Sequence, residues 1–574
     1  MVCKPPKTAL LNHKKVFLVV FLKGVVNMAL ITVKDLSFSY DTAYDMIFEN
    51  VSFQIDTDWK LGFIGRNGRG KTTFLNLLMG RYEYRGTIIA PVDFDYFPFE
   101  VEHEGKNTLE VMKGIIAPFD EWEKEMEECL KRSQAVADEK ESSAGGNEPG
   151  SEGPDESYCL KRYGELQELY QKHDGYIIDE LIEKEIGKLK VDLSVLSRPF
   201  STLSFGERTK VMLASLFLKK NNFLLIDEPT DHLDMEGRDV LADYLNSKSG
   251  FILVSHDRAF LDRCIDHVLS INKANIEVQK GNYSSWYHNK LLNDNYEIEK
   301  NKQLKKDIDG LNKSVSRIAG WSDKTEASKI GSHTFDRGYV GHKSAKMMKR
   351  AKAIENRLNE AIEEKKSLLK NIEQSEHLKM NILPFHSKRY AELKDVSLFY
   401  GDKRIASGID LHIRAGDRIA IRGKNGAGKS TLIKLLLGED IKYTGSFFMA
   451  RGLRISYVSQ DTSRLEGNLK DFSLRYGLDE TIFKTVLRQL DFKRDQFDKD
   501  IGDFSQGQKK KVLLAKSLSE PAHLFLWDEP LNYIDIFSRQ QIEDLILKYG
   551  PTLVFVEHDR LFAEKIATRE LYLG

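Results

Sequence analysis

GRNGRGKT at residues 65–72 and GKNGAGKS at residues 423–430 are the two stretches that decide the fold of this 574-residue chain. Each fits G-x-x-x-x-G-K-[ST], and each stands between a hydrophobic segment that predicts a strand and an apolar segment that predicts a helix. In such a loop, backbone N–H groups at a helix N-terminus point at phosphate oxygens, and the lysine adds a point charge. We therefore expect two α/β nucleotide-binding domains in tandem.

Three further motifs recur in the same order in the two halves of the chain. They are LSFGE at 203–207 and FSQGQ at 504–508, FLLIDEP at 223–229 and LFLWDEP at 524–530, and VSHDR at 254–258 and VEHDR at 556–560. The spacing is also kept, because 23 positions separate Ser204 from Asp227 and Ser505 from Asp528. An ordered repeat of this kind indicates two copies of one domain.

The first copy is longer because about 57 additional residues lie between its phosphate loop and its acidic strand. Residues 118–175 predict two helices around a tip rich in Gly, Pro and acidic residues. The tip, at about 138–157, carries seven acidic side chains and one lysine. We interpret it as a solvated loop, with a docking element as the alternative.

The segment between the two copies predicts an antiparallel helical hairpin. Leu304, Ile308, Leu311, Val315 and Ile318 follow one another in steps of 4, 3, 4 and 3, which is a heptad seam. A second apolar series lies beyond a glycine-containing tip, and it consists of Ala351, Ile354, Leu358 and Ala361. The two helices are expected to pack through these seams.

Ten basic and three acidic side chains between residues 311 and 352 concentrate positive charge in the hairpin. Phosphate is the natural counterpart of such a segment. Trp321, His333, Phe335 and Tyr339 are interleaved in the tip, where aromatic rings can stack on unpaired bases. RNA is thus the expected partner of the hairpin, and a merely solvated charged face is the alternative.

Charge and cysteine content exclude several classes of protein. The 86 Lys and Arg against 87 Asp and Glu exclude a uniformly basic nucleic-acid binder. The 4 cysteines are too few and too scattered for a disulfide scaffold or a zinc cluster, which indicates a reducing, cytoplasmic setting. No apolar run reaches the ~18 to 20 residues that a membrane-spanning helix needs.

Residues 1–27 are interpreted as an N-terminal extension. VFLVVFL at 16–22 resembles a signal peptide, but Lys23 interrupts the run and no cleavage site follows, so we reject secretion. We expect an unstructured segment or an incorrectly assigned start, with a short membrane-touching helix as the alternative. The other domains are predicted at 28–283 with the insertion at about 118–175, at 284–385 for the hairpin, and at 386–574.

Two carboxylates end each predicted acidic strand. Asp227 and Asp528 are expected to hold Mg²⁺, together with the hydroxyls of Thr72 and Ser430. Glu228 and Glu529 are then placed to polarise an attacking water. The alternative is a pair of ordinary capping carboxylates.

His256 and His558 each follow a predicted strand. A neutral imidazole at that place can contact the γ-phosphate or position a water molecule. The alternative role for each histidine is structural.

These motifs together resemble the ATP-binding cassette superfamily, over about residues 28–574. The resemblance implies that two cassettes pair head to tail within this chain. Site one would join residues 65–72 to Ser505 and Gly507, and site two would join residues 423–430 to Ser204 and Gly206. Tyr40 and Tyr400 match the family's adenine-stacking position, with a core tyrosine as the alternative. The implied ATP contacts are Tyr40, Gly65, Arg66, Asn67, Gly68, Arg69, Gly70, Lys71, Thr72, Thr73, Ser204, Gly206, Tyr400, Gly423, Lys424, Asn425, Gly426, Ala427, Gly428, Lys429, Ser430, Thr431, Ser505 and Gly507.

The chain departs from the superfamily pattern at two places. Gln460 in YVSQ matches the Gln-loop and is a further metal ligand by resemblance, but the first copy reads YFPF and has Phe99 there. Phe205 replaces the first glycine of the LSGGQ-like signature, and Phe504 replaces its leucine in the second copy. Coordination in site one is therefore an open question.

Two fused cassettes, a helical insertion and a basic hairpin resemble the ABC-F translation proteins. That resemblance implies a cytoplasmic ATPase that inserts its hairpin into the ribosome near the peptidyl transferase centre, beside P-site tRNA. The wording IGRNGRGKTT and WDEPLNYID is similar to members that protect the ribosome from lincosamides, streptogramin A and pleuromutilins. A housekeeping translation factor and the ATPase subunit of an exporter are the alternatives.

Overall fold

The computed structural model describes residues 29–40, 46–142, 154–231, 233–272, 275–327, 337–367, 378–401, 403–424 and 426–573. Several predictions from the sequence fall outside these ranges. They concern residues 1–27, most of the acidic tip, the hairpin tip with His333 and Phe335, and Asn425.

A six-stranded sheet forms the centre of the first cassette, in the order β5-β6-β7-β3-β8-β9. Its strands are parallel except β9, which runs antiparallel to β8. β6 and β7 consist almost entirely of buried apolar residues, which is typical of strands covered on both faces. The strands are β3 (Lys60–Ile64), β5 (Asp93–Phe97), β6 (Asn222–Asp227), β7 (Phe251–Val254), β8 (His267–Asn272) and β9 (Asn275–Lys280).

The second cassette repeats this plan with a five-stranded parallel sheet in the order β14-β15-β16-β12-β17. Its strands are β12 (Arg418–Gly423), β14 (Ile455–Val458), β15 (Leu524–Asp528), β16 (Leu553–Val556) and β17 (Arg569–Leu573). Register brings equivalent residues together in both sheets, since Asp227 lies opposite Val254 and Asp528 opposite Val556. The motif carboxylates and the histidine two residues beyond each valine therefore meet at one sheet edge.

Each cassette also has a small antiparallel sheet and a group of helices. The sheets are β2-β1-β4, from Phe48–Asp56, Leu30–Phe38 and Arg85–Ile89, and β11-β10-β13, from Lys403–Arg414, Arg389–Tyr400 and Tyr443–Met449. The helices of the first cassette, apart from the insertion, are α1 (Lys71–Leu78), α2 (Thr108–Ile116), α5 (Ile178–Lys188), α6 (Phe205–Leu218), α7 (Met235–Asn246) and α8 (Arg258–Cys264). Those of the second are α11 (Lys429–Leu437), α12 (Leu469–Arg475), α13 (Glu480–Gln489), α14 (Gln506–Ser519), α15 (Ile536–Tyr549) and α16 (Arg560–Ile566). Separate buried clusters line the two faces of each central sheet.

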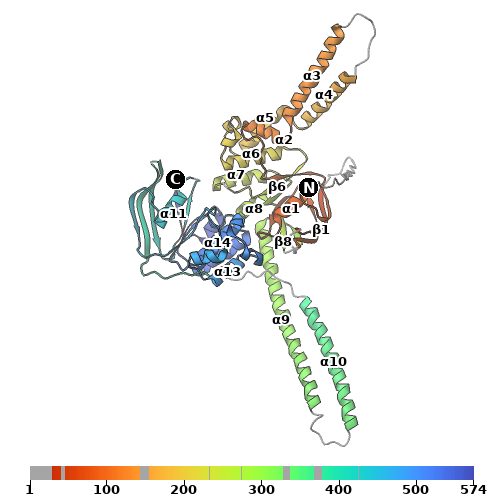
Figure 1. Ribbon diagram of the computed structural model, residues 1–574, viewed down its shortest axis with the longest axis vertical. Helices are drawn as coiled ribbons and strands as arrows, with labels where there is room; N and C mark the ends of the chain where they lie inside the picture. The colour runs from red at the N-terminus through yellow and green to blue at the C-terminus, as the bar shows by residue number, and fades with distance from the viewer. Residues whose placement is uncertain are drawn as a thin grey trace, which may run out of the picture.

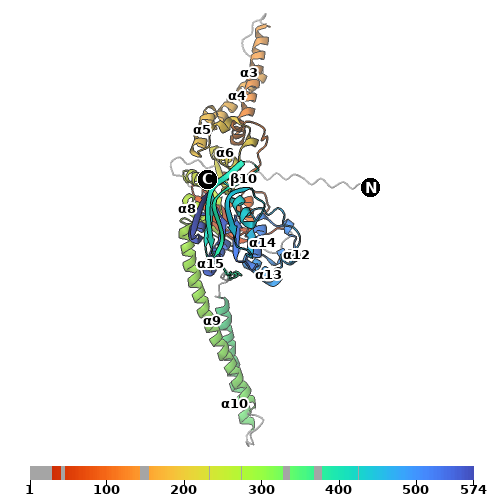
Figure 2. The same ribbon diagram turned by 90° about the vertical axis from the view of Figure 1, so that its left-hand side faces the viewer.

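Two helical pairs project from the cassettes in opposite directions (Figure 1). The insertion forms α3 (Phe119–Ser142) and α4 (Pro154–Lys172), which Arg162 and Glu125 join through an Nε–Oε1 ion pair of 2.8 Å. The linker forms α9 (Tyr283–Ala327) and α10 (Arg337–Ser367), which stay side by side in the turned view (Figure 2). Within the described residues, no helix combines the length and apolar character that crossing a membrane requires.

Among the side chains that the structure describes, the seam between α9 and α10 differs from the heptad prediction at Ile354. Ile308 is buried as expected, but Ile354 is 48% exposed, and Ile362 of α10 is buried. Lys365, three residues after Ile362, contacts Asp307, the residue before Ile308, with Nζ 2.6 Å from Oδ2. The register between the two helices therefore puts Ile354 on the outer face, which the spacing within α10 alone did not reveal.

Candidate active sites

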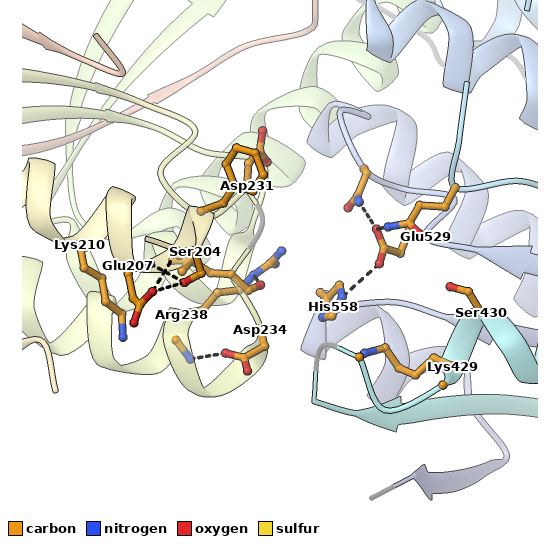
Figure 3. A pocket seen from close by; sticks show the side chains of 18 of the residues that line it. Ser204, Glu207, Lys210, Asp231, Asp234, Arg238, Lys429, Ser430, Glu529 and His558 are labelled. Carbon is orange, nitrogen blue, oxygen red and sulfur yellow. Dashed lines mark hydrogen bonds and ion pairs between the residues drawn. The ribbon is translucent and has the colours of Figure 1, made fainter. Parts of the chain in front are cut away.

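Two cavities lie between the cassettes, and each is built from both of them. The first, of about 1070 Å³, is lined by Lys71 and Thr72 of the first phosphate loop and by Ser505 and Gly507 of the second cassette. The second, of about 890 Å³, is lined by the second phosphate loop and by Ser204 and Gly206. Figure 3 shows Ser204 and Lys429 on opposite sides of this second cavity. The head-to-tail pairing is thus present in the structure.

Glycine is required where each phosphate loop enters its helix. Gly70 and Gly428 have φ of 95° and 89°, in the left-handed region. A Cβ on Gly70 would lie 2.6 Å from Ile47 Cγ2, and one on Gly428 would lie 2.9 Å from Ile405 Cγ2. The backbone of both loops is therefore held in the conformation that leaves the helix N-terminus open to a phosphate.

The two motif lysines fold over their own loops. Lys71 Nζ donates to the carbonyl of Gly65 at 2.8 Å, and Lys429 Nζ donates to the carbonyl of Gly423 at 2.8 Å. Burial lowers the pKa of both ammonium groups. Lys71 lines the first cavity and Lys429 the second, so each cavity has a buried cation from its own phosphate loop.

The remaining predicted ATP contacts divide between those that line a cavity and those that do not. Asn67, Gly68, Gly70 and Thr73 line the first cavity, and Gly426, Gly428, Ser430 and Thr431 line the second. Gly65, Arg66, Arg69, Gly423, Lys424 and Ala427 belong to the loops but line neither cavity.

The predicted metal ligands lie together at each sheet edge. Thr72 Oγ1 donates to Asp227 Oδ2 at 3.1 Å, and Tyr96 Oη donates to the same oxygen at 3.0 Å. In site two, Asp528 Oδ1 is buried without a hydrogen-bond partner. Burial raises the pKa of both aspartates. A buried carboxylate oxygen beside a hydroxyl suits Mg²⁺, which prefers oxygen ligands, so the residues present fit the metal.

Glu228 and Glu529 share an unusual backbone conformation, with φ of 48° in each. The left-handed turn directs each carboxylate from the strand end towards the histidine of the next strand. His256 Nε2 lies 3.4 Å from Glu228 Oε1, and His558 Nε2 lies 3.3 Å from Glu529 Oε1, as Figure 3 shows for site two. Predicted base and histidine are thus in contact in both sites.

The electrostatic surroundings of the two glutamates differ. Burial raises the pKa of Glu228 well above its ordinary value, and the charges of Asp231 and Asp227 add to that effect. Burial also acts on Glu529, but the hydrogen bond and charge of His558 outweigh it and leave the pKa of Glu529 below its ordinary value. Burial holds the pKa of His256 well below its ordinary value, so this imidazole is neutral.

The Gln-loop position differs between the sites as the sequence indicated. Gln460, which was predicted as a metal ligand, donates from Nε2 to Glu529 Oε2 at 2.9 Å. Phe99 lines the first cavity.

The predicted adenine-stacking tyrosines also differ in their surroundings. Tyr40 lines the first cavity, and its hydroxyl lies 2.8 Å from Thr73 Oγ1. Tyr400 is 80% exposed at the end of β10, and the second cavity is lined by Ile405 of the neighbouring strand instead.

The signature serines are the N-cap residues of α6 and α14. Ser204 and Ser505 accept hydrogen bonds from the backbone N–H of Glu207 and Gln508 and form capping boxes. Phe205, which replaces a signature glycine, is 69% exposed and lines both cavities.

Sequence reasoning did not identify the residues that join the cassettes. Asn67 Nδ2 donates to the carbonyl of Tyr533 at 2.8 Å, and Tyr533 lines both cavities. Arg258, two residues after His256, contacts Glu543 and lies 3.5 Å from Asp559, which directly follows His558. The available sequence signal was the arginine that follows each His-Asp dipeptide, but the partner of Arg258 lies more than 280 positions away in the chain.

Comparisons with known proteins agree with this architecture. The ABC transporter family matches residues 48–231 and 406–532. The chain is 28% identical to the ATP-binding protein YdiF of Bacillus subtilis, over 95% of this chain and 80% of that protein. It is 29% identical to the ribosome protection protein VmlR of B. subtilis, over 66% and 69% of the two chains.

It is also 26% identical to the energy-dependent translational throttle protein EttA of Haemophilus influenzae, over 92% and 89% of the two chains. Among solved structures, the archaeal ribosome recycling factor aABCE1 in complex with the ribosomal stalk protein aP1 has a TM-score of 0.53 at 17% identity, over 94% of this chain and 87% of that one. The predicted α/β fold with two tandem cassettes is confirmed.

Proposed function

Because the chain belongs to the ABC transporter family and is an ATPase of its ABC-F branch, we propose that it binds the ribosome when two ATP molecules hold its cassettes together, and leaves it after hydrolysis. The observation that carries this proposal is the pair of cavities, each lined by the phosphate loop of one cassette and the signature serine of the other. A ligand that touches both cassettes favours the closed pair through its differential affinity.

Each cavity holds one ATP in this proposal. Residues 65–72 and 423–430 bind the phosphates, and Ser505 and Ser204 complete the opposite sides. Tyr40 stacks on adenine in the first cavity, and Tyr400, which does not line the second cavity, is assigned that role by resemblance alone. Thr72 with Asp227, and Ser430 with Asp528, are the residues that would hold Mg²⁺, which when bound would neutralise charge on the phosphates.

Glu228 and Glu529 act as the bases that accept a proton from the attacking water. Their neighbours His256 and His558, at 3.4 and 3.3 Å, orient the carboxylates and reach towards the γ-phosphate. The neutral state of His256 suits a hydrogen-bonding role there.

The linker is the proposed ribosome contact. With 45 residues, α9 extends about 68 Å at 1.5 Å per residue, enough to reach far into a large particle. The basic side chains that the structure describes between residues 311 and 352 are solvent-exposed, and they are Lys313, Arg317, Lys346, Lys349, Arg350 and Lys352. Ribosomal RNA is the expected target, with P-site tRNA beside it, because phosphate contacts supply most of the affinity for basic segments.

Two functions on the ribosome remain to be separated. Resemblance in sequence to VmlR, a ribosome protection protein, supports protection against lincosamides, streptogramin A and pleuromutilins. The match to EttA, a translational throttle protein, covers more of both chains and supports a housekeeping role in translation. We propose protection as the first function and the housekeeping role as the second.

Sedimentation with ribosomes tests the common part of the proposal. A Glu228→Gln, Glu529→Gln variant with ATP should pellet with ribosomes, whereas the same variant without nucleotide should stay in the supernatant. Recovery only with membranes would refute the proposal.

Drug susceptibility separates the two roles. Expression of the wild-type chain should raise the inhibitory concentrations of a lincosamide, a streptogramin A and a pleuromutilin, and the double variant is the control. Unchanged values for all three drugs, with ribosome binding intact, would favour the housekeeping role.

A further inference from the structure

The two catalytic glutamates are held by different sets of neighbours. Both carboxylates contact a histidine at nearly the same distance, so the histidines do not distinguish the sites. The difference lies in the side chains at two other equivalent positions. These are Gln460 and Asn532 in the second cassette, and Phe99 and Asp231 in the first.

In site two, amide groups fix the carboxylate from two directions. Gln460 Nε2 donates to Glu529 Oε2 at 2.9 Å, and Asn532 Nδ2 donates to the same oxygen at 2.6 Å. Oε1 is left facing His558. Hydrogen bonds to a charged acceptor are short and strong, so this carboxylate has one orientation and one oxygen available for a water molecule.

In site one, neither of these donors exists. The Phe99 side chain has no polar atom, and Asp231, at the position of Asn532, carries a carboxylate that repels Glu228 instead of an amide that could donate to it. Glu228 Oε2 accepts a hydrogen bond from the backbone N–H of His256 at 3.2 Å, and Oε1, 3.4 Å from His256 Nε2, is buried without a hydrogen bond. The base of site one therefore lacks the pair of amide donors that orients its counterpart.

The cross-cassette contacts beside the two phosphate loops also differ. Asn67 of the first loop donates to the carbonyl of Tyr533, and Arg66 lies 3.9 Å from Asp491, with side chains 13% and 28% exposed. Beside the second loop, the ion pair between Lys424 and Glu236 is 82% and 71% exposed, and Arg422 Nη1 donates to Met235 Sδ at 3.3 Å. Exposed pairs contribute little to an interface, because water and salt screen them.

We propose that site two hydrolyses ATP while site one retains it, and that Gln460 and Asn532 are the positioning residues that make the difference. The inference rests on the proposed binding of ATP in both cavities. ATP kept in site one would hold the cassettes together on that side while site two opens and closes. Turnover would then not require the two cassettes to separate completely.

Photolabelling of the full chain in the absence of ribosomes tests the inference. The chain is incubated with Mg²⁺ and 8-azido-ATP labelled at either the α- or the γ-phosphate, freed of unbound nucleotide, irradiated and digested. Hydrolysis removes the γ label and leaves the α label in place. We expect γ label on the peptide that contains Tyr40 and at least tenfold less on the peptide that contains Ile405, which lines the second cavity, with α label on both.

Exchanging the residues at these two equivalent positions between the cassettes provides the matched variants. Phe99→Gln, Asp231→Asn should lower the γ label at the Tyr40 peptide about tenfold or more, which is the effect expected of hydrogen bonds to a charged group. Gln460→Phe, Asn532→Asp should lower kcat by a similar factor, with little effect on KM, and bring γ label to the Ile405 peptide. Phe99→Leu, which adds no amide, is the control and should keep the γ label at Tyr40.

Each outcome decides between the alternatives. Equal γ label on the two peptides of the wild-type chain, or no response to the exchange in the first cassette, would overturn the inference and leave the proposed function standing. Absence of α label from both peptides would overturn the proposed function itself.

Discussion

Arg258 provides the sharpest test of how the cassettes are joined. It belongs to α8 of the first cassette, but its guanidinium contacts Glu543 and lies 3.5 Å from Asp559, both in the second cassette. The three side chains are 7%, 0% and 1% exposed. Replacement of Arg258 by Met would leave these two acids buried without one of their cationic partners.

The size of the effect follows from the partners that remain. Removal of one member of a buried ion pair costs about 3 to 5 kcal/mol. Lys565 Nζ still lies 2.9 Å from Glu543, and Arg539 still lies 3.1 Å from Asp559, so the low end of that range applies. We expect Arg258→Met to weaken the association of the cassettes by about 3 kcal/mol.

The repeat offers a matched control at the equivalent position of the second cassette. Arg560 pairs with Glu564 within its own helix, and both side chains are more than half exposed. Arg560→Met should change the association by less than about 0.5 kcal/mol. The assay is urea titration followed by fluorescence energy transfer between dyes on the two cassettes. Equal midpoints for both variants would refute the assignment of Arg258 as a cross-cassette anchor.

Three further predictions concern the closing surface, pH and the linker. Gly507→Ala places a Cβ 2.6 Å from the carbonyl oxygen of Tyr533, which should prevent the two cassettes from closing on ATP. ATP should then no longer protect the chain from limited proteolysis between the cassettes. Unchanged protection would contradict this prediction. Burial lowers the pKa of Lys510 to about 8, so between pH 8 and 10.5 the unfolded chain binds more protons at this residue than the folded chain does. The free energy of unfolding of the wild type should therefore rise over that pH range, and it should rise less in Lys510→Met. Denaturation at each pH measures the difference. Lys349→Ala, Arg350→Ala should weaken ribosome binding and make it less dependent on salt. The slope of log K against log salt should fall by about 0.7 to 0.9 for each phosphate that the variant no longer neutralises. A slope equal to that of the wild type would show that neither residue contacts RNA phosphate.

Features that depend on neighbours in the sequence could be predicted well. The glycines of the phosphate loops and the strand that ends in Asp227 each depend on residues within a few positions, and both lie where the pattern indicated. Ile354 was predicted to lie in the seam between the two helices, but it is exposed. The spacing of apolar residues within one helix does not fix which of them face the other helix until the register between the two is known.

The sequence by itself determined that two nucleotide-binding domains are present, because their motifs are local and occur twice, and it predicted which residues face phosphate and that a basic helical hairpin lies between the domains. Only the tertiary structure decided what stands beside Glu228 and Glu529 and which residues join the cassettes. Asn532 and Gln460 reach the same carboxylate oxygen from different loops, and Arg258 meets an acid 285 positions away. The first two contacts arise from the folding of the second cassette and the last from the packing of one cassette against the other, and no periodicity along the chain encodes either kind.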